Sequence, residues 1–458
     1  MNSDKQKRKL TNARELALLV LNRVEQDRSY SNLLLNQMLR KHKLQPGDKA
    51  LVTQIVYGTI QRLNTIDFFL DRFVNKGVHK LETWVKNLLR LSFYQLYYLE
   101  RIPPHAVVDE AVRIAKSRGH SGVAGMVNAV LRNVLRQEGR LVIPEEIPTT
   151  EQIALRHSHP RWLVERWAEQ YGLRVAEQIC GANNGTPHTS VRVNTLSLSR
   201  DELIGQMRQN GLRVMPSPLA PSGVIVEGGG NMADTRWYRE GMLTIQDESS
   251  MLVAEIADPK PGMRVLDCCA APGGKTTHLA EKMHDRGEVW AGDLHPHKVR
   301  LIAEQARRLH LHSVRALASD ARELPGKFEA ESFDCIVLDA PCTGFGVIRR
   351  KPDLKWFKDE RDVAALSSLQ YDILRKIQSL LKPGGTLVYS TCTIGEEENG
   401  NIIKKFLREF PDFAPDTGKL YALPEEIRNK LAVDGMVQIL PQQYNSDGFF
   451  IAKLRKRG

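Results

Sequence analysis

The stretch VLDCCAAPGGKTT, residues 265–277, decides the fold of the C-terminal part of the chain. Three residues suited to a strand lead into a turn of small residues, and a segment that can form a helix follows. Small residues let the backbone approach a ligand closely, and the first turn of a helix offers unpaired N–H groups. The stretch therefore predicts a strand, a ligand-binding loop and a helix in succession.

The same alternation of strands and helices continues to the end of the chain. Strands are expected over 264–268, 288–291, 313–318, 335–338 and 386–390, and a closing hairpin over 436–440 and 448–454. Strands that alternate with helices form a parallel sheet with helices on both faces. The pattern predicts a Rossmann-like α/β domain with a mostly parallel seven-stranded sheet, whose first strand–helix crossover binds a nucleotide-like ligand.

The loop fits neither of two common nucleotide-binding motifs. A phosphate-binding P-loop reads GxxxxGK[ST], and Cys269 stands where its first glycine belongs. The dinucleotide motif GxGxxG is also absent, which argues against a dehydrogenase. The ligand is therefore expected to be neither a polyphosphate nor a dinucleotide.

Three acidic residues follow three successive strands after the loop. Asp293 ends the second strand, twenty residues beyond Gly273, while Asp320 follows the third strand and Asp339 the fourth. An acid at the end of the second strand can accept hydrogen bonds from ribose hydroxyls, and Asp320 could face an adenine amino group. Such a set repels phosphate but suits S-adenosylmethionine, which carries adenine, ribose and a positive sulfonium. The alternative to cofactor binding is a structural role, in which these acids cap the helices that follow.

Two of the six cysteines also follow expected strands. Cys342 comes after the fourth strand and Cys392 after the fifth, where open α/β sheets build their sites. Cys180, Cys268 and Cys335 are better explained as small buried side chains. Because the chain has no CxxC pair, we expect neither a zinc site nor a disulfide framework, and no metal.

A thiol beside a methyl donor suggests a specific chemistry. Carbon 5 of cytosine is a poor nucleophile until a thiolate adds to carbon 6, after which carbon 5 can attack a methyl group. Such covalent catalysis divides one difficult step into easier ones. A carboxyl group at the ring nitrogen promotes the addition, and Asp339 is the candidate.

The motifs CAAPGGK (269–275), DAPCTG (339–344) and STCT (390–393) closely resemble those of the RNA 5-methylcytosine methyltransferases. The resemblance covers about residues 150–458. It implies that Cys392 is the nucleophile, that Cys342 helps to release the product, and that Lys275 contacts a catalytic Asp339. The cofactor-binding residues would then be Cys269, Ala270, Ala271, Pro272, Gly273, Gly274, Lys275, Asp293, Asp320 and Asp339.

The N-terminal third carries the charge surplus of the chain. The net charge is +11, and residues 1–140 hold 24 basic and 12 acidic side chains, a net of +12. Apolar residues recur there at helical spacing, which predicts an all-α bundle. The stretches RELA (14–17), HAVVDEA (105–111) and VNAVLR (127–132) resemble the NusB-type RNA-binding bundle.

A NusB-like bundle followed by such a methyltransferase resembles the arrangement of the 16S ribosomal RNA cytosine-C5 methyltransferases, which implies 16S ribosomal RNA as the partner. Transfer RNA is an alternative substrate, and a non-catalytic RNA-binding assembly factor is an alternative function. The candidate phosphate contacts are the run 5–9, Lys41, Lys43, Lys49, Arg132, Arg136, Arg140, Arg349, Arg350 and Lys351. Phe345, Trp356 and Phe357 could stack on bases, although core packing explains the last two equally well.

We expect three domains: a helical RNA-binding domain over 1–140, a linker and small α+β domain over 141–250, and a methyltransferase domain over 251–458. The small domain is expected to contain helices over 162–171 and 200–210, and strands over 190–193, 212–215 and 223–226. No run of about 18 apolar residues and no signal peptide is present, so we expect no membrane span and a cytoplasmic protein. The expected oligomeric state is a monomer.

Overall fold

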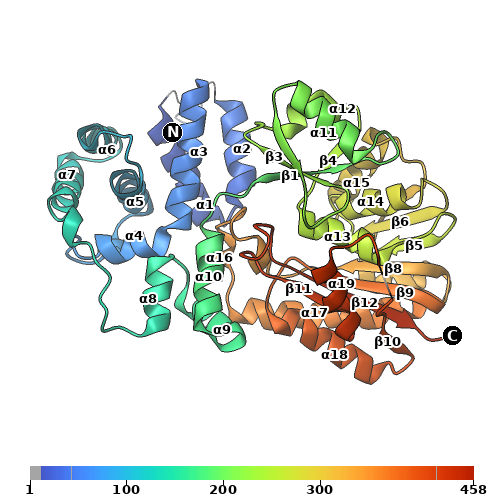
Figure 1. Ribbon diagram of the computed structural model, residues 1–458. Helices are drawn as coiled ribbons and strands as arrows, with labels where there is room; N and C mark the ends of the chain where they lie inside the picture. Colours follow the sequence, from blue (N-terminus) through green and yellow to red (C-terminus); the bar gives the residue numbers. More distant parts are fainter. Residues whose placement is uncertain (1–11, 43, 419) are drawn as a thin grey trace. The chain divides into compact units, whose positions relative to one another are not determined.

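The computed structural model describes residues 12–42, 44–418 and 420–458, which form two compact units (Figure 1). Of these described residues, the helical unit comprises those up to Asn184 together with Ile348–Phe357, and the sheet unit comprises those of Gly185–Val347 and Lys358–Gly458. The division into three domains at residues 140 and 250 stays a prediction.

The helical unit confirms the predicted all-α bundle. In α1 the apolar residues Leu16, Val20 and Val24 recur at helical spacing, and all are buried. The side chain of Asn12 caps the helix by accepting the N–H groups of Arg14 and Glu15. The helices are α1 (Ala13–Asp27), α2 (Ser31–Lys41), α3 (Pro46–Gln61), α4 (Leu63–Leu70), α5 (Thr83–Tyr98), α6 (Pro104–Arg118), α7 (Ser121–Arg136), α8 (Thr149–Arg156), α9 (Arg161–Tyr171) and α10 (Leu173–Asn183).

A short segment from far along the chain, residues 348–357, completes the helical unit. It ends in the one-turn helix α16 (Leu354–Phe357), and Trp356 and Phe357 pack against the bundle core. Lys355 is fully buried, and this burial holds its pKa well below the usual value. Hydrogen bonds tie the segment to the helices. Ser31 Oγ donates to Asp353 (2.5 Å), and Trp356 Nε1 donates to the carbonyl oxygen of Ile60 (2.7 Å). Lys355 Nζ donates to the carbonyl oxygens of Gln61 (3.0 Å) and Ser158 (2.5 Å).

The sheet unit begins with a small antiparallel sheet in the order β2-β3-β1-β4. The strands are β1 (Thr189–Val193), β2 (Arg213–Pro216), β3 (Gly223–Glu227) and β4 (Leu243–Ile245), and α11 (Arg200–Gln209) and α12 (Arg236–Arg239) accompany them. The predicted strands and the predicted helix over 200–210 are confirmed to within one or two residues. The three-residue β4 was not expected, because it is too short to show a period of two.

The larger sheet has eight strands in the order β10-β12-β9-β8-β5-β6-β7, with β11 paired to β12. All pairs from β9 to β7 are parallel, so the mostly parallel sheet and the closing β11–β12 hairpin are confirmed. The seven expected strands are all present, and the short β10 is the eighth. The strands are β5 (Arg264–Asp267), β6 (Glu288–Asp293), β7 (Val314–Ala318), β8 (Phe333–Asp339), β9 (Leu381–Thr391), β10 (Phe413–Pro415), β11 (Met436–Ile439) and β12 (Phe449–Lys456).

Alternate residues of the parallel strands fill two apolar layers. Val265 and Val337 belong to one layer, and their neighbours Leu266 and Ile336 belong to the other. The first layer includes residues of α13 (Glu248–Ala257), α14 (Gly274–Lys282), α15 (Pro296–Arg308) and α19 (Glu425–Asp434), and the second includes residues of α17 (Glu360–Ile377) and α18 (Gly400–Glu409). Figure 1 shows these helices beside the sheet.

The strand order reverses between β5 and β8, so their carboxyl ends form the kind of crevice in which open α/β sheets bind ligands. In the part of the chain that the structure describes, none of the helices is both long and apolar enough to cross a membrane.

Candidate active site

A cavity of about 420 Å³ lies at the carboxyl ends of the parallel strands in the sheet unit. Its volume falls in the range of about 300–1,000 Å³ that is usual for small-molecule sites. Loops after β5, β6, β7, β8 and β9 all contribute to its wall. The lining residues are Cys268, Cys269, Ala271, Asp293, Leu294, His295, Lys298, Asp320, Ala321, Arg322, Asp339, Ala340, Pro341, Cys342, Leu369, Ile373 and Cys392.

The loop after β5 forms one wall and leads into α14. Gly273 has φ +107°, and a Cβ atom there would lie 3.1 Å from Ile302 Cα, so only glycine fits without strain. The N–H of Ala270 donates to the carbonyl oxygen of Gly292 (2.8 Å), which fastens the loop to the end of β6. Of the predicted loop residues, Cys269 and Ala271 line the cavity. Ala270, Pro272, Gly273, Gly274 and Lys275 are not among the lining residues.

The three predicted acids, Asp293, Asp320 and Asp339, all line the cavity. The capping alternative also describes Asp320, whose side chain accepts the N–H of Arg322 (2.9 Å) at the start of a 3-10 helix. Arg322 also donates to this carboxylate through its side chain and thereby lowers the pKa of Asp320. Asp293 accepts the N–H of His295 (3.2 Å).

Asp339 instead makes a partly buried ion pair with Lys275. Lys275 Nζ donates to one of its carboxylate oxygens (2.8 Å) and Ser390 Oγ donates to the other (2.9 Å). Burial alone would lower the pKa of Lys275, but the contact with Asp339 outweighs burial and raises it. Lys275 therefore stays protonated and holds the Asp339 carboxylate in place.

The two predicted thiols lie side by side, with Cys342 Sγ 3.4 Å from Cys392 Sγ. Both line the cavity. The hydrogen bond with Cys392, together with burial, raises the pKa of Cys342 well above the usual value, so Cys342 keeps its proton at neutral pH. Cys180, Cys268 and Cys335 are buried, as expected for structural thiols.

Two further residues, Asp267 and Arg192, are functional candidates that the sequence alone did not indicate. Asp267, at the end of β5, is fully buried, accepts the hydroxyl of Thr276 (2.7 Å), and has its pKa raised to about 7 by burial.

Arg192, on β1, is fully buried and braces the start of α14. In the sequence, Arg192 stands out only as the charged residue between the two valines of VRV (191–193). Its bonds reach Glu281 Oε1 (2.8 Å) and Oε2 (3.1 Å), the carbonyl oxygen of Gly274 (2.7 Å), Thr277 Oγ1 (3.0 Å) and Gln246 Oε1.

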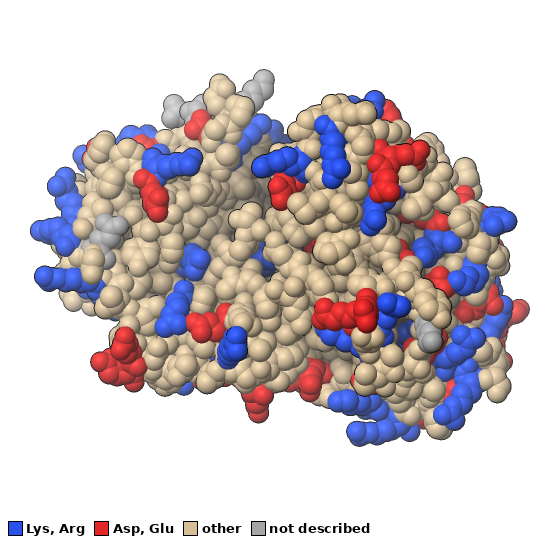
Figure 2. Space-filling view, in the orientation of Figure 1, with Lys and Arg blue, Asp and Glu red and all other residues tan. Residues whose placement is uncertain are grey.

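The candidate RNA contacts divide into exposed and buried groups. The run 5–9 and Lys43 lie outside the described residues. Lys41, Lys49, Arg132, Arg136 and Arg140 are exposed, and Figure 2 shows basic side chains gathered at the edge of the helical unit where Figure 1 places α7.

The suggested stacking residues behave differently. Phe345 is only 2% exposed, so the expectation that it stacks on bases is wrong for this conformation. Trp356 and Phe357 follow the core-packing alternative. Arg349 is 6% exposed, whereas Lys351 is exposed.

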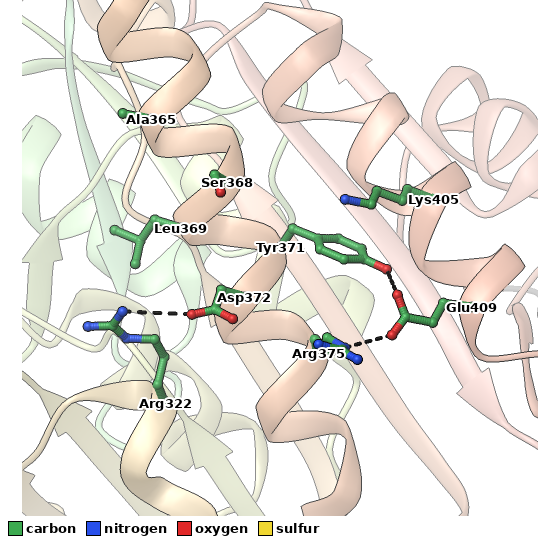
Figure 3. Close-up of a pocket in the computed structure, with 9 residues that line it drawn as sticks. All are labelled: Arg322, Ala365, Ser368, Leu369, Tyr371, Asp372, Arg375, Lys405 and Glu409. Carbon is green, nitrogen blue, oxygen red and sulfur yellow. Dashed lines mark hydrogen bonds and ion pairs between the residues drawn. The ribbon is translucent and has the colours of Figure 1, made fainter.

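A second cavity of about 630 Å³ lies over α17 and α18 (Figure 3). Four of its five charged groups form ion pairs, Arg322 with Asp372 (3.7 Å) and Arg375 with Glu409 (2.6 Å), and the fifth, Lys405, lies over the Tyr371 ring (3.8 Å). The cavity at the strand ends is therefore the better candidate for a site. Across residues 12–42, 44–418 and 420–458, no group of three or more His, Cys, Asp or Glu side chains is placed to hold a metal ion.

Three protein-family models match the chain. The model described as "16S rRNA methyltransferase RsmB/F" matches residues 254–455, and the model described as "NusB family" matches residues 11–136. A third, described as "Methyltr_RsmF/B-like, ferredoxin-like domain", matches residues 159–233. The helical bundle, the small α+β fold and the methyltransferase fold each correspond to one model.

Similar proteins span the whole chain. "Probable ribosomal RNA small subunit methyltransferase B" of Bacillus subtilis (strain 168) is 47% identical over 450 residues, which cover 98% of this chain and 100% of the relative. The crystal structure of PH0851 matches with a TM-score of 0.82 at 28% identity and covers 98% of this chain and 100% of that one. A methyltransferase homolog protein from Pyrococcus horikoshii matches with a TM-score of 0.58 at 33% identity, over 68% of this chain and 99% of that one. The chain therefore belongs to the ribosomal RNA small subunit methyltransferase B family.

Proposed function

We propose that this protein transfers a methyl group from S-adenosylmethionine to carbon 5 of a cytosine in 16S ribosomal RNA, through a covalent bond to Cys392. The observation that carries the proposal is the pair of thiols, 3.4 Å apart, in a cavity that three strand-end carboxylates also line. A methyl donor without phosphates and a cysteine nucleophile both fit this composition.

The cavity suits S-adenosylmethionine for physical reasons. The close packing of Gly273 against α15 leaves no room for a side chain and fixes the path of the loop, whose residues Cys269 and Ala271 line the cavity. Asp293 would accept the ribose hydroxyls, Asp320 would face the adenine amino group, and the carboxylates would favour a cationic sulfonium. When bound, the cofactor supplies an electrophilic methyl group.

Cys392 is the better nucleophile of the two thiols. Because the pKa of Cys342 is raised, Cys342 keeps its proton and can donate it toward Cys392 Sγ, which stabilises negative charge on Cys392. The bond from Cys392 Sγ to carbon 6 moves an electron pair to carbon 5, which takes the methyl group. A base then removes the proton at carbon 5, and the carbon–sulfur bond breaks with its electron pair returning to sulfur. Cys342 is placed beside that bond to assist its release.

Asp339 and Lys275 would orient the base. The Asp339 carboxyl group, held by Lys275 Nζ and Ser390 Oγ, can donate a hydrogen bond to a ring nitrogen of cytosine when it carries a proton, which stabilises the negative charge that develops on the ring as Cys392 adds. The ion pair fixes the carboxylate before the substrate arrives, which lowers the cost of reorganisation.

The RNA substrate is inferred from charge and from the family. The names of the matching family model and of the Bacillus subtilis relative refer to 16S rRNA and to small-subunit ribosomal RNA. In the helical unit, a cavity of about 730 Å³ between α6 and α7 is lined by Arg113, Lys116 and Arg132, among others, which suits phosphate binding. We assign RNA docking to residues 1–140, and the chain is proposed to act as a cytoplasmic monomer.

The decisive test is a Cys392→Ala variant beside a Cys180→Ala control, which removes a buried thiol from the helical unit. We expect Cys392→Ala to abolish formation of 5-methylcytidine, measured by nucleoside mass spectrometry, while RNA binding persists and the control stays active. Methylation by Cys392→Ala at the wild-type rate would refute the proposed nucleophile.

Bisulfite sequencing of RNA from cells that lack the protein would separate the substrate alternatives. Loss of a signal in 16S ribosomal RNA supports the proposal, and loss in transfer RNA supports the alternative substrate. No loss anywhere would favour a non-catalytic assembly factor.

A further inference from the structure

Two neighbouring residues that the mechanism above does not use, Glu398 and Asn399, hold the segments that carry the two thiols. Glu398 ends the 3-10 helix η8 (Glu396–Glu398), a few residues after β9. Each of the two side chains is only 1% exposed. Buried polar side chains need partners, and the partners here lie directly beside the thiols.

Glu398 fastens the residue that follows Cys342. One of its carboxylate oxygens accepts the N–H of Thr343 (2.9 Å), and the other accepts the Thr343 hydroxyl (2.6 Å). Gln370 on α17 donates both to Glu398 (3.1 Å) and to the carbonyl oxygen of Pro341 (2.9 Å). The residues on both sides of Cys342 are therefore fixed by one buried network.

Asn399 fastens the residues on both sides of Cys392. Its side-chain oxygen accepts the hydroxyl of Thr391 (2.5 Å), and its amide donates to the carbonyl oxygen of Thr393 (3.2 Å). The same amide donates to Gln438 on β11 (2.9 Å), which anchors Asn399 to the sheet.

The two networks meet where the hydroxyls of Thr343 and Thr393 lie 2.9 Å apart. The Tyr389 hydroxyl donates to the carbonyl oxygen of Glu398 (2.6 Å) and so ties this short helix to β9. The segments that carry the two sulfur atoms are thus held by side chains that do not line the cavity, together with the backbone bond from the Gly346 N–H to the Cys392 carbonyl oxygen (3.0 Å).

We infer that Glu398 and Asn399 are two positioning residues with different tasks: Glu398 places Cys342 for product release, and Asn399 places Cys392 for attack. The inference rests on the proposed function, because it takes the roles of the two thiols from there. A displacement of about 1 Å at a reacting group can cost about 10²-fold in rate. Loss of either residue should therefore slow one step far more than the other.

The covalent protein–RNA adduct distinguishes the two tasks. With Glu398→Ala, attack continues while release slows, so the adduct on a denaturing gel should rise about tenfold or more above wild type. With Asn399→Ala, attack itself slows, so the adduct should fall below wild type. Glu396→Ala, which removes an exposed charge from the same helix, is the matched control and should leave the adduct unchanged.

General damage to the fold would give a different pattern. If Glu398→Ala and Asn399→Ala lower the adduct equally, or if neither changes it, the division of tasks is wrong. Thr343→Val is a milder variant, because it removes one hydroxyl while the Glu398 carboxylate keeps the Thr343 N–H and the Gln370 amide as donors. Thr343→Val should also raise the amount of adduct above wild type, as Glu398→Ala does.

Thiol cross-linking tests the geometry independently of methyl transfer. Diamide oxidises two adjacent thiols to a disulfide and takes up their two protons and two electrons, and mass spectrometry can follow the Cys342–Cys392 bond. We expect both alanine variants to cross-link at least tenfold more slowly than the Glu396→Ala control. Unchanged cross-linking would overturn the positioning role. Cys342→Ala should itself accumulate the adduct, because the proposed chemistry gives product release to Cys342. If it forms no adduct while cross-linking is slowed in the two alanine variants, the proposed chemistry is refuted and the positioning role stands.

Discussion

Replacing Arg192 by methionine should loosen the start of α14, which carries the cofactor loop. Arg192 is fully buried and forms a two-bond ion pair with Glu281, which is 2% exposed. Its guanidinium also donates to the carbonyl oxygen of Gly274, the first residue of α14 (2.7 Å). In Arg192→Met the Glu281 carboxylate stays buried without its counter-charge.

Breaking a buried ion pair by removing one partner costs about 3–5 kcal/mol. Since about 1.4 kcal/mol is a factor of ten in an equilibrium constant, hydrogen exchange of the α14 amides should accelerate by about 10²–10⁴-fold. Exchange in α17, which does not contact Arg192 by hydrogen bonds, should change much less. Hydrogen exchange followed by mass spectrometry of peptides from the two helices measures both.

A double variant separates the charge from the packing. Replacing both partners of a buried ion pair by apolar residues of similar volume is often close to neutral. Arg192→Met combined with Glu281→Met should therefore recover part of the lost protection. Exchange in Arg192→Met within threefold of wild type, or a double variant worse than the single one, would refute the reasoning.

Three further predictions follow from the sites described above. Gly273→Ala, whose Cβ would lie 3.1 Å from Ile302 Cα, should displace the loop and weaken binding of S-adenosylmethionine at least tenfold in calorimetry, and unchanged affinity would show that packing of the loop against α15 does not shape the site. Because burial raises the pKa of Asp267 to about 7 from 3.8, its contribution to stability is full below about pH 4 and is lost as the pH rises through 7. Asp267→Asn should flatten this decline in the free energy of unfolding, and an identical pH profile would contradict it. Lys116→Ala and Arg132→Ala should each reduce the slope of log RNA affinity against log salt by about one, whereas an unchanged slope would place the RNA elsewhere.

Local patterns predicted the parts of the site that belong to strand ends. Asp293 and Asp339 were found because each closes a strand whose apolar residues are visible in the sequence, and parallel strands bring their carboxyl ends together. Cys342 and Cys392 were found by the same argument. The sequence could place these side chains at one edge of the sheet, but it could not supply the distance between the two sulfur atoms.

The residues that sequence reasoning missed depend on distant partners or on burial. Arg192 pairs with Glu281, which lies 89 residues away in the chain, and no local pattern encodes that contact. Asp267 stands at the end of an ordinary apolar strand, and only its complete burial raises its pKa. Phe345 was expected to be available for stacking because aromatic residues near a site often are, yet it packs in the interior.

The segment 348–357 has a consequence for how the protein is made. The ribosome adds Asn184 long before Phe357, and the 173 residues from Gly185 to Phe357 take roughly 9–35 s at about 5–20 residues per second. During that interval the bundle lacks Trp356 and Phe357 against its core. When Phe357 is added, β5, β6, β7 and β8 have been synthesised and β9 has not. The first unit to emerge is thus completed only late, and during that time nascent-chain chaperones have a defined apolar surface to protect.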